Sequence, residues 1–320
     1  MQDVLLETMD LKKYFSTARG QLHAVDNVSI RVPRGKTLGV VGESGCGKST
    51  LGRTLIHLLE STGGRIMYEN RDITRLGRRE LRQLRKEMQI IFQDPFASLD
   101  PRYTIEDAIR EPLELLGTMN RSQVNDEIDR LMHLVGIDER LRNAYPHELD
   151  GGRRQRVVIA RALAPKPRFI VCDEPVSALD VSIQAQVLNL LQDLQQEMGL
   201  TYLFITHDLS VVRYISEEIC VMYLGQVIEQ APADELFDHP LHPYTKALLS
   251  AIPSVDIHCR PERVLLKGEI TSPIEPKPGC RFAPRCPYAA ECCGQEQRTE
   301  KIAPDHFAAC CRVHEINQKT

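Results

Sequence analysis

A glycine-rich segment near the start of the chain combines the residue types and the spacing that bind phosphate groups. Residues 42–50 match the pattern G-x-x-x-x-G-K-[ST]. In such a loop backbone N–H groups surround phosphate oxygens, the amine of Lys48 reaches the β- and γ-phosphates, and the hydroxyl of Ser49 binds Mg²⁺. A glycine-rich turn without a ligand would not need both side chains in register, so we predict a nucleoside triphosphate site. Its predicted contacts are Gly42, Glu43, Ser44, Gly45, Cys46, Gly47, Lys48, Ser49 and Thr50.

Two adjacent acids later in the chain have the chemistry to complete this site. Asp173 and Glu174 end an apolar run at residues 169–172. At the carboxyl end of a strand, Asp173 would hold Mg²⁺ through water and Glu174 would polarise the water that attacks the γ-phosphate. Such a pair is often only a solvated strand end, but its spacing after the phosphate loop favours the catalytic interpretation.

An alternation of strands and helices is expected to position both motifs, as in an α/β sheet. The apolar run 37–41 predicts a buried strand before the phosphate loop, and residues 49–59 predict a helix after it. Between the loop and the acids, apolar residues from about 105 to 142 recur at spacings of three and four, which predicts an inserted helical block. Further strands are predicted at 5–11, 24–32 and 65–68.

The composition excludes several classes of protein. The chain has 320 residues, 42% of them hydrophobic and 26% charged, with a formal net charge of -4. No window approaches 18 uncharged apolar residues and the N-terminus lacks the pattern of a signal peptide, which predicts a soluble, intracellular protein unless a partner holds it at a membrane. The net charge gives no basis for binding nucleic acid as the main task. Ten cysteines in such a chain indicate metal or redox chemistry rather than disulfides.

One of these cysteines, Cys46, lies inside the phosphate loop, near a helix N-terminus and Lys48. Such surroundings lower the pKa of a thiol and favour its reactivity. The alternative is that Cys46 only fills a tolerant position of the loop.

Further motifs, in a fixed order, give the chain a resemblance to the ATP-binding cassettes of ABC transporters. Residues 149–153 read Leu-Asp-Gly-Gly-Arg, where that family has the signature Leu-Ser-Gly-Gly-Gln. Gln93 matches the Q-loop of the family, residues 177–180 its D-loop, and His207 its switch histidine. Phe15 falls where the family places an aromatic ring on adenine, with Tyr14 as a neighbouring candidate. The resemblance covers roughly residues 1–250.

The resemblance implies a fold and a mechanism. It implies a cassette over residues 1–253 with a RecA-like core, an antiparallel β subdomain and a helical subdomain at about 95–165. Two cassettes would enclose two ATP molecules, each bound by the phosphate loop of one chain and the signature of the other. Glu174 would orient the attacking water and His207 would contact the γ-phosphate, while Mg²⁺ would be held by Ser49, Gln93 and Asp173. The implied nucleotide contacts outside the phosphate loop are Phe15, Gln93, Leu149, Asp150, Gly151, Gly152 and Asp180.

The signature departs from the family at two positions. Asp150 replaces the serine that donates a hydrogen bond to the γ-phosphate, and Arg153 replaces the glutamine. A carboxylate facing a triphosphate would impair one composite site, with the arginine offsetting part of the charge. The alternative is that Asp150 caps the following helix by accepting backbone N–H groups.

Beyond residue 230 the chain resembles one branch, the cassettes of dipeptide, oligopeptide and nickel importers. Residues 236–249 and the proline-rich 266–279 carry this resemblance, and residues 254–279 are predicted to form an extended strap. The branch implies an importer of di- or oligopeptides with a solute-binding protein, two transmembrane permease subunits and usually a second, non-identical cassette, on the cytoplasmic side of the membrane. A nickel or other small-solute importer is the alternative. A non-transport cassette would show a coiled-coil insertion or two fused cassettes, and the chain has neither.

The C-terminal extension, residues 254–320, is rich in cysteine. Four of its cysteines follow the spacing Cys280-x₅-Cys286-x₆-Cys293-x₁₆-Cys310, with Cys292 and Cys311 as adjacent spares. A short segment with few apolar residues needs such a staple, and the spacing lacks the paired C-x₂-C of structural zinc. It resembles the four-cysteine pattern of peptide-importer cassettes that carry a [4Fe–4S] cluster, with Zn²⁺ or free thiols as alternatives. Three nearby arginines would offset the cluster charge or form a solvated rim: Arg281, Arg285 and Arg312.

Overall fold

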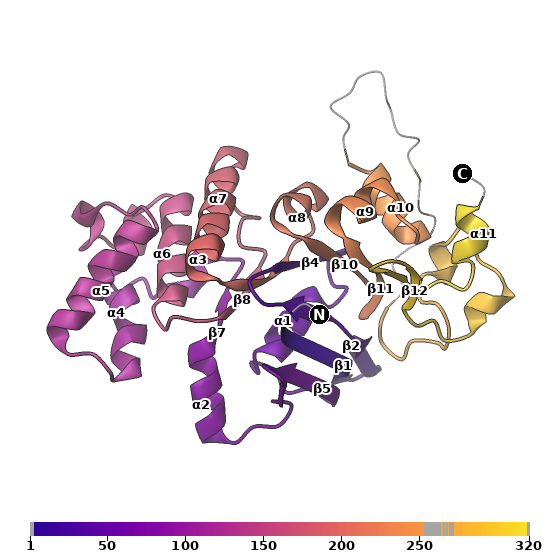
Figure 1. Ribbon diagram of the computed structural model, residues 1–320, viewed down its shortest axis with the longest axis horizontal. Helices are drawn as coiled ribbons and strands as arrows, with labels where there is room; N and C mark the ends of the chain where they lie inside the picture. Colours follow the sequence, from indigo (N-terminus) through magenta and orange to yellow (C-terminus); the bar gives the residue numbers. More distant parts are fainter. Residues whose placement is uncertain (1–2, 253–263, 265, 267, 269–271, 319–320) are drawn as a thin grey trace. The chain divides into compact units, whose positions relative to one another are not determined.

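The structure is a computed structural model that describes residues 3–252, 264, 266, 268 and 272–318. Figure 1 draws its helices and strands, coloured along the sequence. The chain divides into two compact units. The helical unit consists of Met1–Asp3, Pro33–Lys36 and Arg75–Phe204. The loop unit consists of Val4–Val32, Thr37–Thr74 and Ile205–Thr320. Within the described residues, no helix is both long and apolar enough to span a bilayer.

The loop unit begins with an antiparallel sheet in the strand order β2-β1-β5-β6, with β3 paired to β1. These strands are β1 (Val4–Thr17), β2 (Gly20–Val28), β3 (Arg31–Pro33), β5 (Gly63–Tyr68) and β6 (Arg71–Asp72). The single strand predicted over 24–32 is wrong, because the chain leaves the sheet between β2 and β3. The interruption falls at Ser29 and Ile30, between the end of β2 at Val28 and the start of β3 at Arg31.

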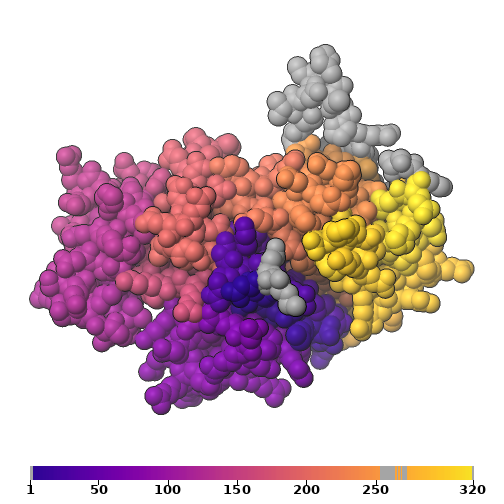
Figure 2. Space-filling view, viewed as in Figure 1, coloured from indigo at the N-terminus to yellow at the C-terminus, as the bar shows by residue number. Residues whose placement is uncertain are grey.

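A second sheet in the loop unit runs in the order β12-β13-β11-β10-β4. The strand β4 is buried at every position and pairs in parallel with β10, whereas β10, β11, β13 and β12 pair in antiparallel fashion. The bounds are β4 (Thr37–Val41), β10 (Glu218–Tyr223), β11 (Gln226–Pro232), β12 (Glu300–Ala303) and β13 (His306–Ala308). The last two strands come from the C-terminal extension, so the extension continues this sheet; its yellow residues lie against the orange part of the chain in Figure 2.

Short helices accompany these strands in the loop unit. The helix after the phosphate loop ends at Leu55, so the expected helix end at residue 59 is wrong; His57, with a φ of 56°, does not continue a helix. The helices are α1 (Lys48–Leu55), α8 (Leu209–Ile215), α9 (Ala233–Asp238), α10 (Pro243–Ser250), α11 (Val313–Asn317), and the 3₁₀ turns η3 (Ala283–Arg285) and η4 (Glu291–Gly294).

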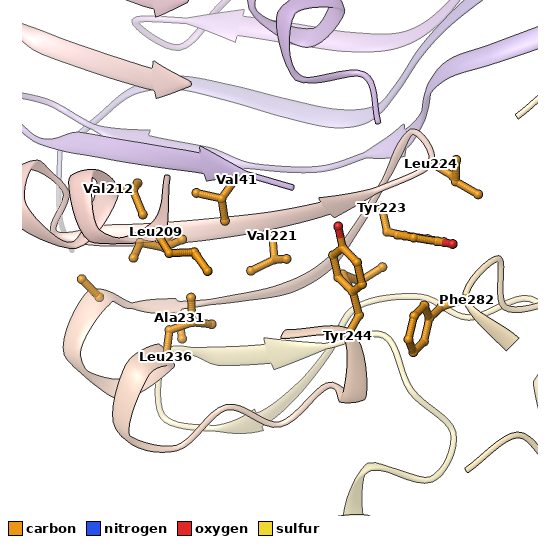
Figure 3. Packing of buried hydrophobic residues seen from close by; sticks show 13 residues of the cluster. Val41, Leu209, Val212, Val221, Tyr223, Leu224, Ala231, Leu236, Tyr244 and Phe282 are labelled. Carbon is orange, nitrogen blue, oxygen red and sulfur yellow. The ribbon is translucent and has the colours of Figure 1, made fainter. Parts of the chain in front are cut away.

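One hydrophobic cluster ties the C-terminal extension to the second sheet (Figure 3). Val41 of β4 and Tyr223 of β10 belong to it, as do Tyr244 of α10 and Phe282 of the extension. The three aromatic rings pack edge to face, with centroids 4.8 Å apart for the two tyrosines and 5.4 Å from each tyrosine to Phe282. Of the three rings only Phe282 belongs to the extension, and burial of one such ring contributes about 1.5–3 kcal/mol to its attachment.

The helical unit holds the strand that ends in the paired acids. The strand β8 (Phe169–Asp173) has β7 (Met88–Ile91) on one side, in parallel, and β9 (Thr201–Ile205) on the other. Its helices are α2 (Arg78–Glu87), α3 (Pro95–Ser98), α4 (Ile105–Leu116), α5 (Arg121–Leu134), α6 (Gly151–Leu163), α7 (Val181–Met198), and the 3₁₀ turns η1 (Glu139–Leu141) and η2 (Pro146–Glu148). Capping boxes at Thr104 and Asn120 begin α4 and α5.

Two predictions about the extension cannot be followed throughout. The domain boundary at 253/254 and most of the strap at 254–279 lie outside the described residues. In the described part of the strap, the N–H of His23 donates to the carbonyl of Pro273 at 3.0 Å, and Leu22 and Ile274 form an isolated bridge. This part of the strap therefore runs along β2.

Candidate active site

The phosphate loop joins β4 to α1, as the motif requires. Gly47 is the N-cap of α1 and has a φ of 106°, a conformation that favours glycine. A Cβ atom at Gly47 would lie 1.9 Å from the carbonyl oxygen of Ala24, so no side chain fits there. The carbonyl of Cys46 accepts the N–H of Gly225 at 2.7 Å. The loop is therefore fixed against its own unit before it meets a ligand.

Lys48 is buried and directs its amine back over the loop. Its Nζ donates to the carbonyl of Gly42 at 2.8 Å and to that of Glu43 at 3.1 Å. These two carbonyls hold the cation at the loop, where it can exchange a carbonyl for a phosphate oxygen. The position of Glu43 thus helps to set the position of the lysine.

Glu43 makes two contacts that the phosphate-loop motif does not predict. Its carboxylate pairs with the guanidinium of Arg285, and its backbone N–H donates to the hydroxyl of Tyr244 at 3.0 Å. These partners lie 242 and 201 residues away in sequence, so no local motif signals them. The pattern predicted Glu43 only as a nucleotide contact.

Cys46 does not have the lowered pKa that its sequence position suggested. Burial raises the pKa of this thiol, and the nearby Lys48 opposes that rise without cancelling it. Of the two interpretations of Cys46, the burial of the thiol supports the packed position over the activated thiol, because desolvation of a thiolate outweighs one neighbouring cation here. Cys46 fills a packed position beneath the loop.

The paired acids stand at the carboxyl end of β8. Asp173 is buried, whereas Glu174 is half-buried and has a φ of 51°. The Oε2 atom of Glu174 accepts a hydrogen bond from Nε2 of Gln93 at 2.9 Å. The structure thus brings together the predicted catalytic carboxylate and the predicted Q-loop residue. A left-handed glutamate costs roughly 1 kcal/mol of backbone strain, and such strain is concentrated at functional sites.

The signature segment begins α6, and Asp150 is its N-cap. Oδ1 of Asp150 accepts the N–H of Arg153 at 2.8 Å, and Oδ2 lies 3.4 Å from Nε of the same arginine. Of the two interpretations of Asp150, the structure shows the capping contact. Leu149 is buried beside it. A Cβ atom at Gly152 would lie 2.5 Å from the side chain of Ile183, which explains a glycine here through packing on α7.

The remaining motif residues lie at exposed ends of elements. Asp180 is the N-cap residue of α7 in the helical unit, although its side chain makes no capping bond. His207, in the loop unit, immediately precedes Asp208, which caps α8 by accepting the N–H of Ser210 at 2.8 Å. Both predicted contacts are thus accessible to a ligand.

The two candidate adenine-stacking residues differ in their surroundings. Tyr14 stacks on His23 with a centroid distance of 3.9 Å, and its hydroxyl donates to Asp26. Burial and the bond to Asp26 raise the pKa of Tyr14. One face of the Tyr14 ring is therefore covered by His23, and its hydroxyl is bonded to Asp26. Phe15 is partly exposed on β1, with Nζ of Lys13 at 4.8 Å from its ring centre, and it stays the predicted adenine contact.

The cysteines of the extension gather around Cys293. The three sulfur atoms that lie within 4.8 Å of one another belong to Cys292, Cys293 and Cys311, so the two predicted spares come closest to Cys293. Burial raises the pKa of Cys280 to about 11, and the charges of Cys293 and Cys310 add to that rise. The predicted quartet therefore occupies one region of the extension without forming a single-ion site.

Among the described residues, the sulfurs close enough to share one ion belong to Cys292, Cys293 and Cys311, a group that contains one member of the predicted quartet. In a cluster each cysteine binds a different iron, so the four sulfurs need not meet the distance limit of one ion. Zn²⁺ would instead need four ligands around one point. The expected arginine rim is wrong for two of the three residues, because Arg281 pairs with Asp26 and Arg285 with Glu43. Their side chains are 7% and 9% exposed, too buried for a solvated rim.

Comparison with known proteins gives the family. Residues 25–177 match the model of the ABC transporter family, and residues 228–293 match the model described as oligopeptide/dipeptide transporter, C-terminal region. The oligopeptide transport ATP-binding protein AppF of Bacillus subtilis is 49% identical, with 97% of each chain covered. The oligopeptide transport ATP-binding protein OppF of Salmonella typhimurium is 48% identical, covering 97% of this chain and 96% of the other.

A solved structure gives the same result for the fold. The dimeric cassette MJ0796, bound to ADP and Pi after hydrolysis, is 29% identical, covers 72% of this chain and 99% of its own, and superposes with a TM-score of 0.66. This confirms the predicted α/β cassette fold. With its phosphate loop, its paired acids and relatives alike over almost the whole length, the chain belongs to the ATPase cassettes of ABC transporters, in the branch with the oligopeptide/dipeptide transporter C-terminal region.

Proposed function

We propose that this chain is the ATP-hydrolysing subunit of a binding-protein-dependent importer of di- and oligopeptides. The observation that carries the proposal is the match of residues 228–293 to the oligopeptide/dipeptide transporter region, on a chain that also has the phosphate loop and the paired acids of a cassette. The relatives named above are oligopeptide transport proteins, which supports peptides over the alternative of nickel or another small solute.

The residues of each unit support an assignment of roles in hydrolysis. Lys48 would neutralise the β- and γ-phosphates, and Glu174, oriented by Gln93, would polarise the attacking water. We assign Mg²⁺ to Ser49 at the start of α1, to Asp173 at the end of β8 and to Gln93. His207 would stabilise the charge that spreads over the γ-phosphate. We assign the signature residues to the nucleotide held by a partner cassette.

The proposal includes partners and a location. We propose a second, non-identical cassette, two permease subunits in the membrane, and an extracytoplasmic binding protein reached through the complex. The chain would then lie at the cytoplasmic face of the inner membrane, held there by the permeases. Relatives that are named as components of peptide transport support this assembly.

A groove in the helical unit suits a permease segment. It encloses about 690 Å³ and includes Phe92, the residue before Gln93, with the 81% exposed side chain of Leu115. Arg82, Arg85 and Lys86 stand on its walls, whereas Arg161 is paired with Glu111 at 2.9 Å, so an apolar segment with an acidic end near the first three fits it best. A permease seated on Phe92 would influence the Gln93–Glu174 contact directly.

We propose a [4Fe–4S] cluster on Cys280, Cys286, Cys293 and Cys310, with Zn²⁺ as the alternative. The thiols gathered around Cys293 and the shortage of apolar residues in the extension support a structural centre. When bound, such a centre supplies a covalent staple for the extension. Protein purified without oxygen should contain about four irons and four sulfides per chain, and Cys286→Ser should remove them. Stoichiometric zinc without sulfide would contradict the cluster and support the Zn²⁺ site instead.

Transport in reconstituted vesicles tests the main proposal. The full complex should take up labelled tripeptides in an ATP-dependent manner, and Glu174→Gln should reduce hydrolysis on the order of 10²- to 10⁴-fold while MgATP binding persists. ATP-dependent uptake of nickel with no response to peptides would establish the alternative solute. Wild-type hydrolysis by Glu174→Gln would refute the role of the carboxylate.

A further inference from the structure

Among the described residues, Glu43 joins the phosphate loop to the C-terminal extension through an ion pair with Arg285. The two Nη atoms of Arg285 lie 2.8 Å and 3.1 Å from the two carboxylate oxygens of Glu43, a two-pronged ion pair. The arginine side chain is 9% exposed and that of the glutamate 24%. A pair of this geometry and burial is strong and directional, unlike an exposed ion pair.

Glu43 is held at three points, and the third is the catalytic lysine. Its N–H donates to the Tyr244 hydroxyl, its carboxylate meets Arg285, and its carbonyl accepts from Nζ of Lys48 at 3.1 Å. A shift of the Glu43 backbone would therefore move one of the two carbonyls that hold Lys48. Arg285 and Lys48 are thus connected through one intermediate residue, Glu43, which contacts both.

Arg285 itself sits on a rigid support. Its guanidinium lies 5.9 Å from the ring centre of Tyr223 and 3.4 Å from the hydroxyl of that residue. The N–H of Arg285 donates to the carbonyl of Phe282 at 2.9 Å, and Phe282 packs edge to face on Tyr223 and Tyr244 (Figure 3). The support that positions the arginine thus includes the tyrosine that binds the Glu43 N–H.

We propose that Arg285 is a positioning residue for nucleotide binding, which acts through Glu43 to hold the phosphate loop and Lys48 in the geometry that receives ATP. The cassette then binds ATP fully only when the C-terminal extension is folded in place. The tip of the loop lines a space of about 270 Å³ together with Ser272 and Pro273, so the extension borders the loop on this side as well.

Nucleotide affinity and steady-state kinetics separate this role from simple stabilisation. Arg285→Ala should weaken binding of a non-hydrolysable MgATP analogue to the full chain about tenfold, the range of coupling for a buried pair. In the assembled transporter KM for ATP should rise by a similar factor while kcat falls less than threefold. A change that only destabilised the fold would reduce the active fraction, which lowers kcat and leaves KM unchanged.

Further variants keep the test decisive if Arg285→Ala folds poorly. Glu43→Gln removes the charge from the loop side and should raise KM in the same direction, and the double variant should be no worse than the stronger single variant. Arg285→Lys keeps the positive charge but loses the two-pronged contact of the guanidinium, so its KM for ATP should lie between those of the wild type and Arg285→Ala. Arg298→Ala is the matched control, since Arg298 is an exposed arginine of the extension paired at 3.4 Å with Glu296. Unchanged KM and affinity in both Arg285→Ala and Glu43→Gln would overturn the proposal.

Discussion

Replacing His306 by alanine should loosen the hairpin β12–β13 from the sheet of the loop unit. His306 lies in β13 without exposed surface, and its Nε2 is 2.8 Å from Oε1 of Glu229 in β11. Its Nδ1 is 3.5 Å from Oε1 of Glu235. Glu229 is equally buried and also accepts the N–H groups of Leu241 at 2.6 Å and His242 at 2.8 Å.

The magnitude follows from what remains around Glu229. Removal of one partner of a buried ion pair usually costs about 3–5 kcal/mol, because the other charge stays desolvated. Two backbone N–H groups still bind the carboxylate in the variant, so we expect the low end of that range, about 3 kcal/mol in the free energy of opening the hairpin. This corresponds to a roughly hundredfold larger open population.

The effect should depend on pH. Burial lowers the pKa of His306, but hydrogen bonds to Glu229 and Glu235 outweigh burial and the net pKa is raised above 6.5. Because the pKa of His306 is higher in the folded state, protonation of His306 stabilises the folded state fully below about pH 6.5. This stabilisation is lost as the pH rises through the folded-state pKa. Burial lowers the pKa of His242 to about 4, so its titration acts below pH 6.5 and is common to both proteins. A difference in pH dependence between the two proteins above pH 6.5 can therefore be attributed to His306 rather than to His242.

Native-state hydrogen exchange measures the opening directly. The N–H of Ala309 donates to the carbonyl of Ile228 at 2.8 Å and reports on the attachment of the hairpin. The ratio of exchange rates between His306→Ala and the wild type should be about 10² at pH 6 and should shrink toward pH 9. His314→Ala changes an exposed histidine of α11 and serves as the control. Equal rates at pH 6, or a ratio independent of pH, would refute the reasoning.

Three further predictions concern the candidate site. Asp150→Ala should destabilise the first turn of α6 by about 1 kcal/mol, whereas Asp150→Ser, which keeps a cap, should leave stability and ATPase turnover unchanged, as measured by hydrogen exchange and phosphate release. Cys46 should react with a maleimide only after unfolding, because the buried thiol has a raised pKa; rapid labelling of the native chain would contradict this. Lys48→Ala should weaken MgATP binding more than tenfold in a titration, whereas Glu174→Gln should bind with nearly wild-type affinity.

Local sequence patterns predicted which strands and helices carry the motifs, but they predicted the ends of these elements less well. The strand before the phosphate loop, residues 37–41, coincides with β4 because a fully buried strand is a continuous apolar run. The break between β2 and β3 falls at Ser29 and Ile30, and the run of alternating apolar residues around it conceals it. The expected continuation of α1 to residue 59 failed because His57 adopts a left-handed conformation, which the sequence pattern does not reveal.

The candidate site was predictable where its residues belong to contiguous motifs. Gln93 and Glu174 were identified separately, and the structure adds the hydrogen bond that joins them. Long-range partners such as Arg285 and Tyr244 were not predictable, because a tertiary contact leaves no periodicity in either segment. The sequence left open whether Cys46 is activated or packed, because neighbours in sequence do not reveal the burial that raises its pKa.

The C-terminal hairpin also determines how the cassette behaves in a crowded solution. The strand β13 covers the edge of β11, pairing Ala308 with Glu229 and Phe307 with Gln230. Without the hairpin, β11 would present a row of unpaired N–H and C=O groups, a template for pairing with another chain. With it, the outer strand among the described residues is β12, which is short and carries the exposed charges of Glu300 and Lys301. A chain shortened to residues 1–252 should therefore self-associate with rising concentration, seen as growing particle size in light scattering, while the full chain stays dispersed.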